Sequence, residues 1–305
     1  MMNFMLTLLL LTAHPIGGSA NGNLTLLHDG EVIDQVSRTQ FSQYPFGDSV
    51  IDHKKYLDFT DLIEKKVYES PVDARIGPSG KIIIEKNGHT LNRRKFKEIF
   101  YTNYYRKSDS DYEVPLRNVY PKVDSELLAH IRTKQIGHYV TYFNSYNKER
   151  TNNISLAAKA IDNSVVFPGE TFSFNKVVGK RTTSRGYMKA PVIVRGELSE
   201  GIGGGICQVS STLFNAVDRA GVRIVERYSH SRRVPYVPPH RDATVSWNGP
   251  DFTFENPHNQ PILIRANMSG GQLVIVIYSS DSIDYQRRNV PNAPERLPIE
   301  IRNGE

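Results

Sequence analysis

The segment GIGGGICQVSST, residues 201–212, leads from a run of glycines into Cys207, the single cysteine of the 305-residue chain. Apolar residues continue after it at helical spacing, which places one set on a single helix face: Val209, Leu213, Ala216, Val217 and Ala220. Gly221 then suits a left-handed C-cap. The sequence therefore predicts a helix with one buried face that carries Cys207 at its N-terminus.

The position of Cys207 at the N-terminus of the predicted helix is favourable for thiol chemistry. The N-terminus of a helix presents unpaired N–H groups and about half a positive charge, which lowers the pKa of a thiol. The glycines, Gly203, Gly204 and Gly205, let the backbone approach a ligand, and their N–H groups can hold a developing oxyanion. Cys207 is therefore a candidate nucleophile.

A thiolate needs a proton partner, and two downstream residues can supply one. His230 follows a predicted strand over 222–228 that would return beside the helix. Asp242, at the start of another predicted strand, can orient the imidazole. Two plainer interpretations remain at this point, because isolated cysteines are usually buried small hydrophobes and glycine turns also bind phosphate. No Lys-Ser or Lys-Thr follows the glycines, which excludes a P-loop.

The predicted class is α+β with two domains. Apolar and polar residues alternate in several short segments within residues 136–280, on both sides of the helix that carries Cys207. This pattern predicts a mainly β domain. Residues 58–135 predict a small α+β domain, with a helix behind a Thr60 N-cap, a strand pair, an amphipathic helix and a strand over 112–120. Residues 21–57 look like a lead-in segment and 281–305 like a C-terminal tail.

The amino-acid composition limits which cell compartment and which partners fit this protein. One cysteine excludes an internal disulfide and a cysteine-rich zinc site, and a net charge of +6 suits an anionic neighbour. Residues 1–20 combine a short leucine-rich run with a small-residue cleavage pattern, which predicts a signal peptide, although no Lys or Arg precedes the run. No later segment has membrane-spanning length, so we expect a secreted protein. Export argues against nucleic acid as a partner.

The motifs together resemble the VanW domain. The resemblance extends over about half of the chain and rests on these segments: GGGICQVSSTL at 203–213, ER at 226–227, HS at 230–231, YVPP at 236–239, DATV at 242–245 and FPGETFSFN at 167–175. His240 departs from the glycine expected in the loop before Asp242. The PVDAR segment, residues 71–75, also resembles the small peptidoglycan-binding domain that often precedes VanW.

The resemblance implies a protein on the extracellular face of a Gram-positive cell envelope, with a family name taken from glycopeptide (vancomycin) resistance. It also implies cysteine-dependent L,D-transpeptidation of peptidoglycan, with Cys207 as nucleophile, His230 as proton carrier and Asp242 as its orienting partner. No metal or cofactor is expected. The alternative is a non-catalytic peptidoglycan-binding or accessory protein in which Cys207 packs inside.

Substrate would then lie against the glycine turn and nearby polar residues. Stem peptides or glycan are the expected ligands, with anionic wall polymer as a further partner. Arginine forks suit carboxylates, which makes the basic residues beside His230 and Asp242 candidates. The predicted substrate-binding set is Gly203, Gly204, Gly205, Gln208, Ser210, Arg232 and Arg241.

Overall fold

The computed structural model describes residues 22–194 and 197–295, which fall into two compact units. Among these described residues, unit 1 contains those up to Val72 together with Lys86–Lys122, and unit 2 contains Asp73–Glu85 and those from Val123 onward. Helices and strands are mixed in both units, which confirms the α+β class. The predicted signal peptide, residues 1–20, lies outside the described residues. Among the described helices, none combines the length and apolarity needed to cross a membrane.

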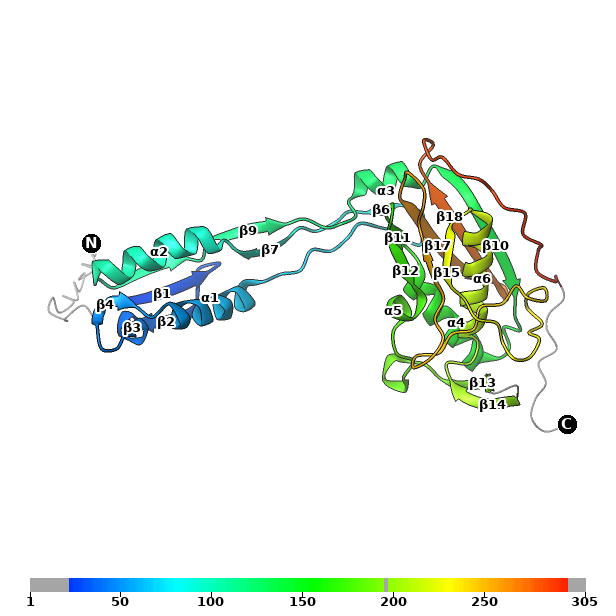
Figure 1. The fold of residues 1–305 in the computed structure, drawn as a ribbon, viewed down its shortest axis with the longest axis horizontal. Coiled ribbons are helices and arrows are strands. Elements are labelled where there is room, and N and C mark those ends of the chain that lie inside the picture. Colours follow the sequence, from blue (N-terminus) through cyan, green and yellow to red (C-terminus); the bar gives the residue numbers. More distant parts are fainter. Residues whose placement is uncertain (1–21, 195–196, 296–305) are drawn as a thin grey trace, which may run out of the picture. The chain divides into compact units, whose positions relative to one another are not determined.

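Unit 1 is built on a three-stranded sheet with the order β2-β1-β8. Strand β1 pairs antiparallel with β2 and parallel with β8. Figure 1 labels most elements of this unit. The elements of unit 1 are β1 (Asn23–His28), β2 (Glu31–Ser37), η1 (Arg38–Phe41), β3 (Ser42–Gln43), β4 (Gly47–Ile51), α1 (His53–Val67), β7 (Gly88–Leu91), α2 (Arg93–Arg106), β8 (Ser110–Glu113) and β9 (Leu116–Val119).

An aromatic cluster between α1 and α2 forms the core of unit 1. Phe96 and Phe100 lie one helical turn apart on α2, so they face the same side and pack on Phe59 of α1. The Asn92 side chain caps α2 by accepting a hydrogen bond from the Lys95 N–H at 3.2 Å. The amphipathic pattern in the sequence therefore predicts α2 correctly.

Three details of unit 1 differ from the sequence prediction. Helix α1 begins at His53 with Asp52 as N-cap, and Thr60 lies inside it, where its hydroxyl donates to the Tyr56 carbonyl. Residues 21–57 are no separate lead-in, because Leu24 and Leu26 of β1 are buried in the same core as the helices. The strand expected over 112–120 is divided into β8 and β9 around Pro115.

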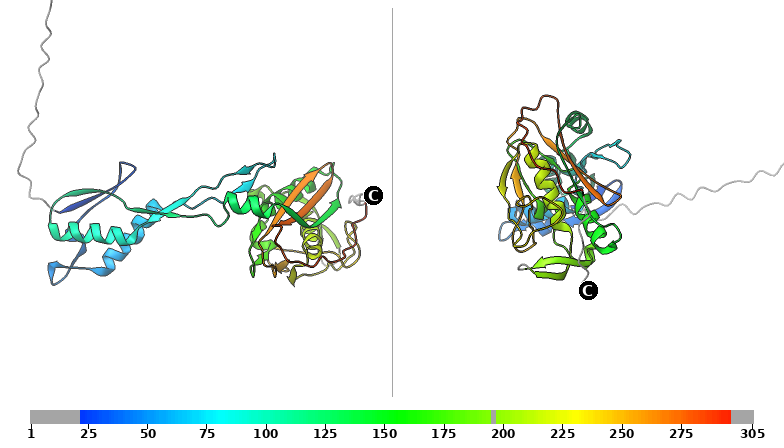
Figure 2. Two further views of the ribbon diagram at one scale, coloured as in Figure 1. Left: turned by 90° about the horizontal axis from the view of Figure 1, so that it is seen from above. Right: turned by 90° about the vertical axis from the view of Figure 1, so that its right-hand side faces the viewer.

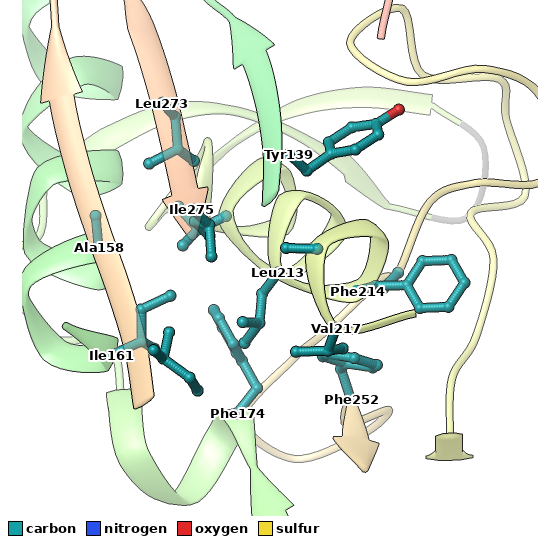
Figure 3. Packing of buried hydrophobic residues seen from close by; sticks show 14 of the residues in the cluster. Tyr139, Ala158, Ile161, Phe174, Leu213, Phe214, Val217, Phe252, Leu273 and Ile275 are labelled. Carbon is teal, nitrogen blue, oxygen red and sulfur yellow. The ribbon is translucent and has the colours of Figure 1, made fainter. Parts of the chain in front are cut away.

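Unit 2 contains a four-stranded antiparallel sheet with the order β10-β18-β17-β11. Helices α4 and α6 pack on it, and Figures 1 and 2 show α6 against one face of the sheet. In Figure 3, Leu213 and Val217 of α6 point toward Phe174 and Phe252. The elements are β10 (Lys134–Tyr142), α4 (Lys148–Ile161), β11 (Val165–Val166), α6 (Ile206–Arg219), β17 (Ile262–Ser269) and β18 (Gln272–Ser279).

A smaller apolar cluster adds a hairpin to unit 2. Strands β5 (Arg75–Ile76) and β6 (Ile82–Ile83) lie beside α3 (Ser125–Ile131), and Ile76 is buried with Leu263 of β17. The sequence prediction placed this hairpin in the domain 58–135. It packs with unit 2 instead, because its apolar residues are buried against α3 and β17.

The remaining elements of unit 2 surround α6. A second sheet has the order β12-β16-β15, and β13 and β14 form a hairpin. The segment 281–295 also packs on this unit, with Ile283 and Val290 buried in its main core. These elements are β12 (Thr171–Ser173), α5 (Phe174–Val178), η2 (Thr183–Arg185), β13 (Lys189–Val194), β14 (Glu197–Ile202), β15 (Arg223–Glu226) and β16 (Thr253–Glu255).

Candidate functional site

Helix α6 is buried on all sides. Of its 14 residues, only Cys207 and Asp218 keep intermediate exposure. The sequence pattern predicted one buried face, so this part of the prediction is wrong: the polar residues between the apolar ones are covered by β10 and by the segment that carries Asp242. Cys207 therefore lies at the end of a helix that is fixed by the whole unit.

The glycine turn positions the N-terminus of α6. Gly205 is the N-cap, with a φ of 107° and no side-chain cap. A Cβ on Gly205 would lie 2.9 Å from Cγ1 of Ile154, and one on Gly204 would lie 2.6 Å from the Ala190 backbone. These glycines are required because only a chain without a Cβ fits against α4 and β13 in this conformation.

His230 and Asp242 lie on the irregular segment that follows β15, where an isolated bridge joins Tyr228 and Thr244. The Nδ1 atom of His230 lies 2.6 Å from Oδ2 of Asp242, and the His230 backbone N–H donates to the same oxygen at 2.6 Å. Both side chains are at least nine-tenths buried. The carboxylate therefore fixes the imidazole and leaves Nε2 for another partner.

That partner is Cys207. A side-chain hydrogen bond joins Cys207 and His230. The Sγ atom also lies 3.6 Å from the Val245 carbonyl oxygen and 3.8 Å from the Thr244 hydroxyl. The structure thus brings together the three residues that the sequence predicts as nucleophile, proton carrier and orienting group.

The electrostatics of the three side chains favour a charged pair. Burial acts to raise the pKa of Cys207, but the hydrogen bond and charge of His230 outweigh it, and that pKa lies below its ordinary value. Burial acts to lower the pKa of His230, while hydrogen bonds to Asp242 and Cys207 raise it to about 9. The pKa of Asp242 is lowered: burial opposes this change, but hydrogen bonds from His230 overcome it. The arrangement favours a thiolate beside an imidazolium.

Two serines of α6 hold the Asp242 segment in place. The Ser211 hydroxyl accepts from the Ala243 N–H at 2.9 Å and donates to the Cys207 carbonyl at 2.7 Å. The Ser210 hydroxyl donates to the Ala243 carbonyl at 2.5 Å. Ser210 was predicted to bind substrate, but it is fully buried and joins the helix to the Asp242 segment.

Of three other predicted substrate-binding residues, two have side chains that make contacts inside the fold and one is exposed. The Gln208 amide is buried and donates to Thr141 and to the Tyr142 carbonyl. Arg241 donates to Asn215 and to Asp218, both further along α6 than Cys207. Arg232 is exposed. The structure brings the side chains of Gln208 and Arg241 into contacts that maintain the fold.

Sequence reasoning missed some residues at the site. Ser211 lies one helical turn from Cys207, and that spacing was a usable signal. Arg181 was not detectable in this way, because it lies on the loop after α5 and reaches the site only through the fold.

Other features of the described residues lie apart from Cys207. A cavity of about 570 Å³ in unit 2 is lined by His138, Arg219, Arg287, Arg288 and 289–292, and it does not include the thiol. In unit 1, His28, Asp29 and Glu113 offer atoms within 4.8 Å of one another that could hold a metal ion. Exposed groups of this kind are common without a metal, so neither feature changes the description of the site.

The geometry defines a class of site: a thiol at a helix N-terminus, hydrogen-bonded to a histidine that a buried aspartate orients. The chain belongs to the VanW-like family. The family model described as VanW like protein matches residues 149–278, which confirms the resemblance in the sequence.

Two relatives support this membership. The uncharacterized protein YoaR of Bacillus subtilis (strain 168) is 56% identical over 301 residues, which is 99% of either chain. The vancomycin B-type resistance protein VanW of Enterococcus faecalis (strain ATCC 700802 / V583) is 33% identical over 85 residues, covering 28% of this chain and 31% of that protein. No solved structure matches the chain.

Proposed function

We propose that this protein acts on peptidoglycan as a cysteine-dependent L,D-transpeptidase of the cell envelope. One observation carries the proposal: Cys207, His230 and Asp242 form a continuous hydrogen-bonded chain at the N-terminus of α6. A thiol with a lowered pKa beside a histidine with a raised one is the arrangement that nucleophilic catalysis requires.

The reaction begins with attack of the Cys207 thiolate on the carbonyl of the third residue of a donor stem peptide. The bond to the terminal D-alanine breaks, and the protonated His230 gives its proton to the leaving amine. A thioester to Cys207 remains. The amine of a second stem then attacks the thioester, its proton passes to His230, and the thiolate leaves as the new cross-link forms.

The first turn of α6 supplies one oxyanion donor in this scheme. The N–H groups of Ile206 and Gln208 donate to the carbonyls of Gly203 and Gly205 at 3.2 and 3.0 Å, so they already have partners. The Cys207 N–H lies between them at the positive end of the helix. We therefore assign the Cys207 N–H to the developing negative charge.

The setting of the proposal is the extracellular face of the envelope. The net charge of +6 suits anionic wall polymers, and the name of the Enterococcus relative associates that protein with vancomycin resistance. The proposal includes export by the predicted signal peptide and a peptidoglycan-binding role for unit 1. Stem peptides are the proposed substrates.

The experiment compares muropeptide digests of peptidoglycan incubated with the wild-type protein and with Cys207→Ala. The wild type should add cross-links between third residues of stem peptides, and the variant should lose them by about 10⁴-fold or more. Thermal unfolding of the variant serves as the control for folding. Equal cross-linking by both proteins would remove the nucleophile. Absence of new cross-links in both, with retained binding to peptidoglycan, would favour the non-catalytic accessory protein.

A further inference from the structure

Arg181 places a cationic side chain against the glycine turn that leads into Cys207. It lies on the loop between α5 and η2, where the Tyr187 N–H donates to the Thr182 carbonyl and the Gly179 N–H donates to the Asn175 carbonyl. These bonds hold the loop on both sides of Arg181. Its side chain passes the glycine turn, since a Cβ on Gly203 would lie 3.3 Å from both Cβ and Cγ of Arg181.

The terminal nitrogens of Arg181 have no hydrogen-bond acceptor in the described part of the chain. Both terminal nitrogens, Nη1 and Nη2, are buried and lack a hydrogen-bond acceptor there, and Cζ lies 5.9 Å from the centre of the Phe174 ring. A buried charge without a partner is strongly destabilising. Burial accordingly lowers the pKa of Arg181, while negative charge on Tyr187, Cys207 and Asp251 would act to raise it.

The neighbouring carboxylate does not satisfy this cation. Asp251 accepts hydrogen bonds from the Ser173 hydroxyl at 2.5 Å, from the Asn175 N–H at 2.8 Å and from the Phe252 N–H at 2.7 Å. Its two oxygens are thus engaged in closing the turn at the start of α5. Arg181 is left with a forked pair of donors, and that geometry fits a carboxylate.

We propose that Arg181 is a substrate-binding residue that holds a carboxylate of the peptide attacked by Cys207. This inference rests on the proposed function and makes it more specific. In a donor stem that ends at D-alanine, the free carboxylate is two bonds from the nitrogen of the bond that breaks. Arg181 therefore selects donors that end in that carboxylate and places their carbonyl against the thiolate.

The test compares a negative and a neutral alkylating reagent on Cys207, so that it does not depend on transpeptidation. The ratio of the iodoacetate rate to the iodoacetamide rate should fall roughly tenfold in Arg181→Gln, because the variant loses a charge-assisted contact to the reagent's carboxylate. The control Lys180→Gln removes a charge from the adjacent, exposed residue and should keep the wild-type ratio. An unchanged ratio in Arg181→Gln would overturn the proposal.

A second measurement uses the wild type alone and remains valid if Arg181→Gln does not fold. Acetate at constant ionic strength should slow the reaction of Cys207 with iodoacetamide, whereas acetamide at the same concentration should not. Equal effects of the two additives contradict a carboxylate site. A retained preference for iodoacetate in a protein that forms no cross-links would remove the transpeptidase function and leave the carboxylate site in place.

Discussion

Helices α2 and α6 are both 14 residues long, but few residues of α2 are buried and most residues of α6 are. On α2, four residues are buried and the Asn92 side chain caps the first turn. On α6, 12 residues are buried and the N-cap is a glycine without a side-chain cap. The comparison teaches that α2 is an ordinary amphipathic helix, whereas α6 is a buried helix whose first turn has no side-chain cap and presents the Cys207 N–H.

The largest expected effect concerns the core around α6. Leu213→Ala should lower the free energy of unfolding by about 2–5 kcal/mol, because Leu213 is fully buried against the sheet of unit 2. Lys95→Ala, on the exposed face of α2, should change it by less than about 0.5 kcal/mol. Denaturant titration measures both values. Similar losses for the two variants would break the contrast between the helices.

The glycine turn gives the next effect. Gly205→Ala should destabilise unit 2 by more than about 1–2 kcal/mol, since the alanine would need a left-handed φ and would contact Ile154. Gly270→Ala is the matched control, with a positive φ and open space around the added Cβ. Thermal unfolding of both variants should show the larger loss at Gly205. An equal loss would mean that the close packing of the turn has no energetic consequence.

The cap of α2 gives a smaller effect. Asn92→Ala should reduce the stability of unit 1 by about 1 kcal/mol, because the Lys95 N–H loses its acceptor. The rate at which Cys207 is alkylated should not change. Hydrogen exchange at the first turn of α2 measures the first effect, and a loss of thiol reactivity would show that the cap matters beyond its own helix.

Periodicity was sufficient to predict several elements from the sequence. The amphipathic helix expected within residues 58–135 is α2, and the helix expected after the glycines is α6. Both segments carry their pattern locally. The hairpin Arg75–Ile83 was assigned to the wrong domain, because only contact with Leu263, far along the chain, fixes its place.

The sequence was sufficient to identify candidate site residues, but it could not predict what their side chains contact. Cys207 was identifiable because glycines precede it and a helical pattern follows. Gln208 belongs to the same motif, yet its amide binds Thr141 and Tyr142. The tertiary structure buries α6 on all sides. It therefore determines which polar side chains of the helix point to the site and which point to neighbouring strands.

The most direct test of the central claim is the pH dependence of Cys207 alkylation by iodoacetamide in the wild type and in His230→Gln. Because the contact with His230 lowers the pKa of Cys207, the wild-type thiol should titrate below the ordinary value of about 8.5. In His230→Gln, only the contacts with Val245 and Thr244 still oppose burial, and the pKa of Cys207 should rise above that of the wild type. Titration at or above about 8.5 in both proteins would contradict the claim that His230 holds Cys207 as a thiolate.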